Sequence, residues 1–230
     1  MGDTPTGNDA RVDLIAVADR LYGDDLSRKP LTYLVEYDRI FQSFQDKPIR
    51  LLELGVQNGL SILMWQEYFQ GRAEVVGIDV SPKPATFPED PRFSFLQGGQ
   101  DDPVVIAAAC DGRPFDVIID DASHLGFLTA RSFALLFPTL LNPGGVYVIE
   151  DICTAFTSSG ADFDCTDYCP AEIGLPGSPR IFPSHHHGMV GFVKQLIDHA
   201  MGPTAAGGYT RYAIESMLIK TNIAYIRKAL

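Results

Sequence analysis

Residues 118–124 read Ile-Ile-Asp-Asp-Ala-Ser-His, and residues 149–151 read Ile-Glu-Asp. Each stretch is an apolar run that ends abruptly in carboxylates, as a buried strand does where it reaches the edge of a sheet. In an open α/β sheet, ligands bind outside the carboxyl ends of the strands. We therefore expect three or four acids and one histidine to converge on one crevice. Because neighbouring carboxylates repel one another, this pattern favours a hard cation or a hydroxyl-rich ligand between them.

From residue 49 onward the chain alternates apolar strands with helices. Five strands are expected, at residues 49–54, 75–78, 93–96, 115–119 and 146–149. Helices are expected at residues 61–69, 103–109, 127–141 and 190–201. This alternation predicts a parallel sheet with helices on both faces. The chain ends in two further strands, at 212–218 and 223–226, which must be antiparallel because so few residues join them.

The segments outside this alternation suggest how the chain is divided. Residues 1–48 are expected to form an N-terminal helical segment, with an i, i+3, i+4 apolar stripe from Tyr33 to Phe44. Residues 49–230 are expected to form the main domain. Residues 152–187 are rich in glycine and proline, and so long a loop is usually functional, which predicts a lid over the Glu150-Asp151 end. His185, His186 and His187 lie in it and are expected to be lid or surface residues rather than ligands of one ion.

Composition excludes several classes of partner. The 230 residues carry a formal net charge of −11, which argues against nucleic acid and against an anionic membrane surface. No stretch approaches the roughly 20 apolar residues of a membrane span. The first ten residues, MGDTPTGNDA, lack the apolar core of a secretory signal, so a cytoplasmic location is expected. The four cysteines are expected to be reduced thiols without metal: Cys110, Cys153, Cys165 and Cys169.

The loop after the first strand suggests a cofactor. It contains Gly55 and Gly59 but not the G-x-G-x-x-G that would seat a pyrophosphate at a helix start. A glycine here lets the backbone approach a ligand closely. Asp79, at the end of the second strand, suits a bidentate contact to a ribose diol. A sugar-bearing cofactor without a pyrophosphate points to S-adenosylmethionine; the alternative is that the two glycines merely form a tight turn.

Four stretches of the chain carry a family resemblance: residues 51–69, 75–80, 118–124 and 132–154. They resemble class I methyltransferases of natural-product biosynthesis, in particular the metal-dependent sugar O-methyltransferases of the mycinamicin and rhamnosyl-tetracenomycin type. Cephalosporin-hydroxylase-like proteins share the same core. The paired motifs D-D-x-S-H and E-D carry most of the likeness, which spans roughly residues 29–155 and then the terminal hairpin.

The resemblance implies a Rossmann-like α/β fold, with a seven-stranded, mostly parallel sheet and an antiparallel C-terminal hairpin. The cofactor site is then expected at Glu53, Gly55, Gly59, Ser61, Asp79, Gln97, Gly98 and Asp120. Asp121, Glu150 and Asp151 would bind magnesium, and His124, beside Asp121, would be the general base. Two departures stand out: Ala122 replaces a frequent glycine, and the extra N-terminal domain of some macrolide enzymes is not seen.

Methyl transfer to a hydroxyl needs a base and a means of holding the acceptor, and the histidine and carboxylates could supply them. A histidine with an ordinary pKa near 6.5 is well placed to take a hydroxyl proton at neutral pH. Magnesium held by three carboxylates could bind two neighbouring sugar oxygens and lower the hydroxyl pKa. The alternatives are that the carboxylates bond backbone amides and that His124 is structural.

The sequence therefore predicts a magnesium-dependent S-adenosylmethionine O-methyltransferase. Its acceptor would be a sugar hydroxyl of a glycosylated natural product, as in antibiotic biosynthesis. One alternative is a phenol or catechol acceptor, and another is a non-catalytic partner protein of the same fold. A homo-oligomer is expected by family analogy alone.

Overall fold

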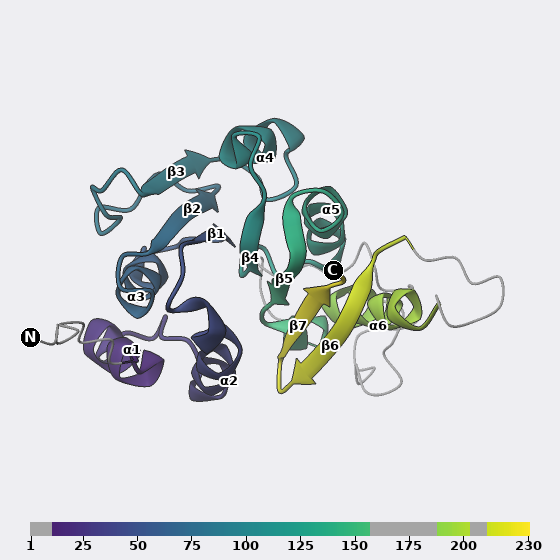
Figure 1. Cartoon of the computed structure of the whole chain (residues 1–230), viewed down its shortest axis with the longest axis horizontal. Coiled ribbons are helices and arrows are strands. Elements are labelled where there is room, and N and C mark those ends of the chain that lie inside the picture. The colour runs from purple at the N-terminus through teal and green to yellow at the C-terminus, as the bar shows by residue number, and fades with distance from the viewer. Residues whose placement is uncertain (1–10, 157–187, 203–210) are drawn as a thin grey trace, which may run out of the picture.

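One seven-stranded sheet runs through the described part of the chain, and helices cover both of its faces (Figure 1). The computed structural model describes residues 11–156, 188–202 and 211–230. The strands are β1 (Ile49–Leu54), β2 (Ala73–Asp79), β3 (Phe93–Gln97), β4 (Phe115–Asp120), β5 (Leu141–Ile149), β6 (Ile214–Lys220) and β7 (Ile223–Lys228). Their order across the sheet is β3-β2-β1-β4-β5-β7-β6.

The strand directions confirm the predicted fold. The first five strands are parallel, whereas β7 is antiparallel both to β5 and to β6. The chain order reverses between β1 and β4, which are neighbours in the sheet although two strands separate them in sequence. In doubly wound folds such a switch point opens a crevice at the carboxyl ends of the strands. The residues that follow β1 and β4 therefore flank the natural place for a ligand.

Of the helices in the described ranges, three pack on each face of the sheet, and Figure 1 shows them on either side of it. One face carries α1 (Leu14–Tyr22), α2 (Leu31–Phe41) and α3 (Leu60–Tyr68). The other carries α4 (Pro103–Cys110), α5 (Gly126–Leu136) and α6 (Gly188–Met201). Successive strand residues alternate between the faces, so Leu51 belongs to the first core and Leu52 to the second. Short 3₁₀ turns follow α2 (Gln42–Phe44) and β5 (Ile152–Phe156).

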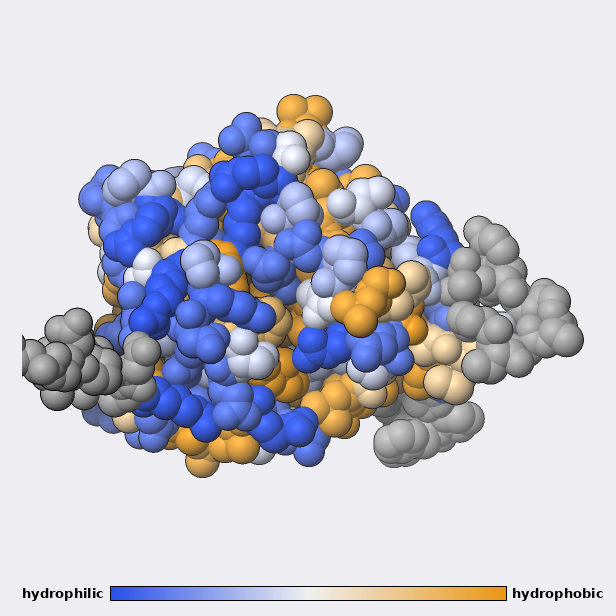
Figure 2. Space-filling view, viewed as in Figure 1, coloured by the Kyte–Doolittle hydropathy of each residue, from blue (hydrophilic) through white to orange (hydrophobic). Residues whose placement is uncertain are grey.

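Local sequence explains where two of these helices begin. Asp13 accepts hydrogen bonds from the amides of Ile15 and Ala16 at the start of α1. Asp102 caps α4 in the same way, with Pro103 at the first helical position. The surface seen in Figure 2 is largely hydrophilic, with scattered apolar patches, as a chain of net charge −11 leads one to expect.

One pair of element boundaries was predicted wrongly. The helix expected to run to residue 141 ends at Leu136, and the strand expected at Val146 already begins at Leu141. The run Asn142-Pro143-Gly144-Gly145 reads as a turn but lies inside β5, whose pairing with β4 shifts register there. A bulge of this kind tolerates proline and glycine in a strand.

Several expectations fall beyond the described residues. The predicted lid is described only up to Phe156, and His185, His186, His187, Cys165 and Cys169 lie outside the described ranges. Cys110 is a buried free thiol and Cys153 an exposed one. Among the described helices, none combines the length and the apolar character that crossing a membrane requires.

Candidate functional site

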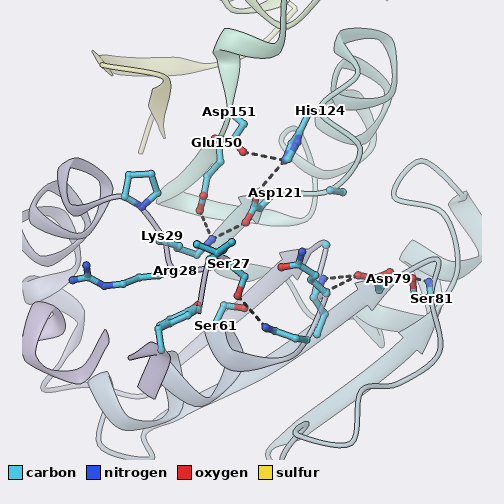
Figure 3. A pocket seen from close by; sticks show the side chains of 18 residues that line it. Ser27, Arg28, Lys29, Ser61, Asp79, Ser81, Asp121, His124, Glu150 and Asp151 are labelled. Carbon is cyan, nitrogen blue, oxygen red and sulfur yellow. Dashed lines mark hydrogen bonds and ion pairs between the residues drawn. The ribbon is translucent and has the colours of Figure 1, made fainter. Parts of the chain in front are cut away.

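A cavity of about 700 Å³ opens at the carboxyl ends of β1, β2, β4 and β5 (Figure 3). The loops that follow these strands form its floor, and the segment between α1 and α2 forms a wall that includes Ser27, Arg28 and Lys29. Of the predicted site residues, seven line it: Gly55, Ser61, Asp79, Asp121, His124, Glu150 and Asp151. The crevice predicted from the strand ends is therefore present.

Lys29 occupies the centre of the acidic cluster. Its ammonium nitrogen lies 2.7 Å from Asp121 Oδ2, 2.7 Å from Glu150 Oε1 and 3.7 Å from Glu53 Oε1. The residue is only 5% exposed. No sequence motif singles out Lys29, and the one signal that could have found it is the cost of burying several acids without a cation.

A second group lies closer to the mouth of the cavity. His124 Nε2 is 3.0 Å from Asp121 Oδ1 and 3.6 Å from Asp151 Oδ2. One ligand atom from each of these three residues lies within 4.8 Å of the others, and all three residues are half-buried. Within the described chain this is the arrangement that could hold a metal ion.

Glu150 stands apart from that group. Its Oε1 accepts hydrogen bonds from Lys29 Nζ and, at 2.5 Å, from the Tyr37 hydroxyl, and its side chain is 2% exposed. Of the three predicted magnesium ligands, the structure thus brings Asp121 and Asp151 together with His124, while Glu150 is engaged with Lys29.

The Asp151 carboxylate is held from two distant parts of the chain. The Tyr33 hydroxyl of α2 lies 2.8 Å from Asp151 Oδ1 and 2.9 Å from the Asn222 carbonyl oxygen, and its single proton is shared between these two acceptors. The Asn222 side-chain amide, in the turn between β6 and β7, donates to the same Oδ1 at 3.3 Å. Because both donors meet one oxygen, Oδ2 is left to face His124.

Burial and charge shift the pKa values of these groups in opposite directions. Burial raises the pKa of Glu53 to about 7, and burial with the nearby Asp121 charge also raises the pKa of Glu150. Burial alone would raise the pKa of Asp121, but Lys29 and His124 outweigh it and lower that pKa.

The pKa values of Lys29 and His124 are both raised by neighbouring carboxylates. Burial opposes a charge on Lys29, yet the carboxylates of Asp121, Glu150 and Glu53 hold its pKa well above the usual value. Burial likewise works against protonated His124, but its contacts with Asp121 raise its pKa. The ammonium of Lys29 is therefore charged throughout the neutral range.

At the other end of the cavity, Asp79 organises the loop after β1. Its Oδ2 accepts the backbone amides of Val56 and Gln57, each at 2.8 Å, and its Oδ1 accepts the amide of Ser81 at 2.8 Å. A carboxylate oxygen has two lone pairs, so Oδ2 is fully engaged by the two loop amides, whereas Oδ1 retains one acceptor position.

Five predicted cofactor residues do not line the cavity: Glu53, Gly59, Gln97, Gly98 and Asp120. Glu53 is fully buried beneath it and accepts a hydrogen bond from the Ser61 hydroxyl at 2.9 Å. Asp120 is also buried and accepts from Gln100 at 3.0 Å and from Tyr147 at 3.1 Å. These two acids support the strand ends from below.

The two loop glycines make close contacts within the protein itself. A Cβ built on Gly55, at φ +86°, would lie 2.1 Å from the Asp121 carbonyl oxygen. A Cβ on Gly59, at φ +81°, would lie 2.6 Å from Thr86 Oγ1. Gly55 thus lines the cavity and also allows the loops after β1 and β4 to touch at the switch point.

Comparison with known proteins gives consistent relatives, although no protein-family model matches the chain. A rhamnosyl tetracenomycin-C 2'-O-methyltransferase from Streptomyces olivaceus is 32% identical over 211 residues, which are 86% of this chain and 50% of that protein. Demethylmacrocin O-methyltransferase from Streptomyces fradiae is 32% identical over 207 residues, 84% of this chain and 47% of that protein. The chain spans about half the length of the curated relatives it matches.

A solved structure extends the likeness to three dimensions. The MycE methyltransferase of the mycinamycin pathway, in complex with Mg, SAH and mycinamycin VI, superimposes with a TM-score of 0.73 at 27% identity. The match covers 96% of this chain and 55% of that one. By sequence, the chain is a homologue of sugar O-methyltransferases of macrolide and tetracenomycin biosynthesis, and its fold is that of the class I methyltransferase structures it matches.

Proposed function

We propose that the protein is a magnesium-dependent, S-adenosylmethionine-dependent O-methyltransferase that acts on a sugar hydroxyl of a glycosylated natural product. The observation that carries this proposal is a single cavity with Asp79 at one end and the group Asp121, His124 and Asp151 at the other. Relatives at about 30% identity act on sugar hydroxyls, which supports the same acceptor class here.

The cofactor is proposed to lie along the loop after β1. Asp79 lines the cavity, and the remaining acceptor position of its Oδ1 is proposed to receive a ribose hydroxyl; Gly55 and Ser61 line the same cavity. Five further residues are proposed to support the cofactor site without lining the cavity, by shaping this loop and its neighbours. They are Glu53, Gly59, Gln97, Gly98 and Asp120. The MycE structure holds SAH, the product of the same cofactor.

The residues present fit a magnesium site. Two carboxylates at the mouth, Asp121 and Asp151, offer the hard oxygen ligands that magnesium prefers, and Glu150 would supply a third. Magnesium bound there would supply Lewis-acid polarisation of neighbouring sugar oxygens.

His124 is proposed to take the proton of the reacting hydroxyl. Asp121 orients the imidazole through its 3.0 Å contact with Nε2 in the free protein. The wall formed by Ser27, Arg28 and Lys29 would align the acceptor with the methyl group and keep water out, which is the larger part of catalysis in a direct displacement.

The central test is methyl transfer by the purified protein. It would be incubated with S-adenosylmethionine and Mg²⁺ against a panel of vicinal-diol glycosides and of catechols, with product identified by mass spectrometry. We expect methylated glycosides. Methylated catechols alone would assign the other acceptor class, and cofactor binding without transfer to any acceptor would favour the non-catalytic partner.

Removal of metal provides a second prediction. We expect a chelator to abolish transfer and Mg²⁺ to restore it, because the hydroxyl pKa must be lowered at the same site. Full activity in excess chelator would remove the metal from the mechanism.

Substitution of His124, the proposed base, provides a third prediction. We expect His124→Ala to lower turnover by about 10²-fold or more while the calorimetric affinity for S-adenosylmethionine stays unchanged. Asp151→Asn serves as a comparison that should weaken metal binding as well. Equal turnover in wild type and His124→Ala would contradict the assignment.

Three sequence-based expectations remain proposals. We propose a division into an N-terminal helical segment up to residue 48 and a methyltransferase domain from 49 to 230, and a homo-oligomer that light scattering would test. A cytoplasmic location stays a prediction from the sequence.

A further inference from the structure

The Lys29 ammonium holds two of the three proposed metal ligands. It donates to Asp121 Oδ2 and to Glu150 Oε1, each at 2.7 Å (Figure 3). Its side chain is 4% exposed, so water screens these contacts very little. The positive charge at this point is therefore supplied by the chain itself.

The exposure of the carboxylates shows the order in which an ion meets them. The side chains of Asp121 and Asp151 are 25% and 35% exposed, whereas that of Glu150 is 2% exposed. A cation entering from the cavity reaches the first two directly. At Glu150 Oε1 it meets the Lys29 nitrogen, which already contacts that oxygen at 2.7 Å.

We propose that Lys29 and the divalent ion compete for Asp121 and Glu150, and that the ammonium withdraws when the ion binds all three carboxylates. This inference rests on the magnesium site of the proposed function and assigns to Lys29 the role of resident counter-cation in the metal-free protein.

Physical chemistry supports exchange over joint occupancy. Magnesium binds oxygen at about 2.0–2.1 Å, so an ion on the same carboxylate oxygens would lie within about 5 Å of the ammonium in a buried, weakly screened place. Like charges so close repel strongly. The ion carries twice the charge of Lys29, and displacing the ammonium removes the repulsion.

The side chain has room to move while its backbone stays in place. Pro30, the N-cap of α2, follows Lys29 directly and restricts its backbone to extended conformations. The four-carbon stem is flexible, and Lys29 lines the 700 Å³ cavity into which it could turn. Exchange then needs a change of rotamer only.

The test is Mn²⁺ affinity measured by electron paramagnetic resonance, without any turnover. Wild type would be compared with Lys29→Met, which removes the charge and retains the length, and with Lys29→Arg, which retains the charge. Lys220→Met is the matched control, because Lys220 is 43% exposed and pairs with Glu36 outside the cavity. Circular dichroism would establish that each variant is folded, with Lys29→Gln as a second neutral variant.

We expect Lys29→Met and Lys29→Gln to bind Mn²⁺ about tenfold or more tightly than wild type, and Lys29→Arg and Lys220→Met to show no gain. Unchanged or weaker binding in the neutral variants would overturn the competition and leave the metal site standing. Absence of Mn²⁺ binding in every variant would overturn both this inference and the magnesium site.

Discussion

Two of the three residues that could hold a metal ion have a left-handed backbone. His124 has φ +57° and Asp151 has φ +52°, and Asn222, which bonds to Asp151, has φ +70°. Aspartate, asparagine and histidine tolerate this region better than most residues, yet it costs about 1 kcal/mol for each. Strain of this kind accumulates at functional sites because the surrounding structure holds the side chains in one place.

Gly55 gives a prediction at the same scale. Gly55→Ala would combine a positive φ with a Cβ 2.1 Å from the Asp121 carbonyl oxygen, so we expect a loss of roughly 3 kcal/mol or more in unfolding free energy. Gly112→Ala is the matched control, since φ there is +70° but no atom lies within 4 Å of the added Cβ. We expect that control to lose about 1–2 kcal/mol. Urea denaturation measures the unfolding free energies of both variants. Equal losses would show that the loop around Asp121 shifts at little cost to make room for the added Cβ.

At the scale of elements, a charged network ties β1, β2 and the end of α4 together. Glu74 of β2 accepts from Arg50 of β1 at 2.9 Å and, through both oxygens at 2.7 Å, from Arg113. Arg50 also donates to the carbonyls of Cys110 at 2.8 Å and Ala109 at 3.2 Å, in the last turn of α4, where carbonyls lack the usual helical partner. The network lies at the opposite end of the strands from the cavity.

The network makes stability depend on pH. Hydrogen bonds from Arg113, and then Arg50, hold the pKa of Glu74 below its usual value. A lowered carboxyl pKa stabilises the fold above the unfolded pKa of about 4.3, and this is lost as pH falls through the folded pKa. We expect the free energy of unfolding of wild type to exceed that of Glu74→Gln by about 1 kcal/mol at pH 7. The difference is no larger because the Glu74 side chain is partly exposed to water. The difference should vanish between about pH 5 and pH 2.

Unfolding curves at a series of pH values measure this difference. Glu89→Gln is the control: Glu89 is 86% exposed in its pair with Lys83, so its loss should leave stability unchanged. A gap between wild type and Glu74→Gln that is constant with pH would exclude the ionised carboxylate as its source.

At the scale of the whole molecule, the N-terminal helices share a core with the sheet. An aromatic cluster joins α2 to α3 and to β7: Tyr37 packs 5.2 Å from Trp65 and 5.5 Å from Tyr225, and Phe41 packs 5.9 Å from Trp65. One of these helices, α2, supplies both Tyr33 and Tyr37 to the acidic residues. The packing that stabilises this face therefore also positions the site.

We accordingly expect α1 and α2 to unfold together with the sheet. Trp65 is the one tryptophan of the chain and is fully buried between these elements, so its fluorescence reports on their packing. Urea transitions followed by this fluorescence and by far-ultraviolet circular dichroism should coincide. An earlier fluorescence transition would mean that the N-terminal helices detach first.

Much of this architecture follows from local pattern. Apolar runs that end in acids predict the strands and their direction, and the short connection before Ile223 forces an antiparallel pair. The prediction of β5 failed at Pro143 and Gly144, because a bulge lets turn-forming residues stay in a strand. Which residues gather at the strand ends was equally readable, since parallel strands place their ends at one edge.

By itself the sequence determined the order of elements, the parallel sheet with its terminal hairpin, and the acids and histidine that end β4 and β5. Only the tertiary structure decided that Lys29, from the segment before α2, lies among the acids and pairs with Glu150. It alone also decided that Tyr33 and Asn222 orient Asp151. The physical reason is range. Periodicity and strand ends act between near neighbours, whereas the partner of a buried charge is chosen by packing between segments about 70 to 190 residues apart.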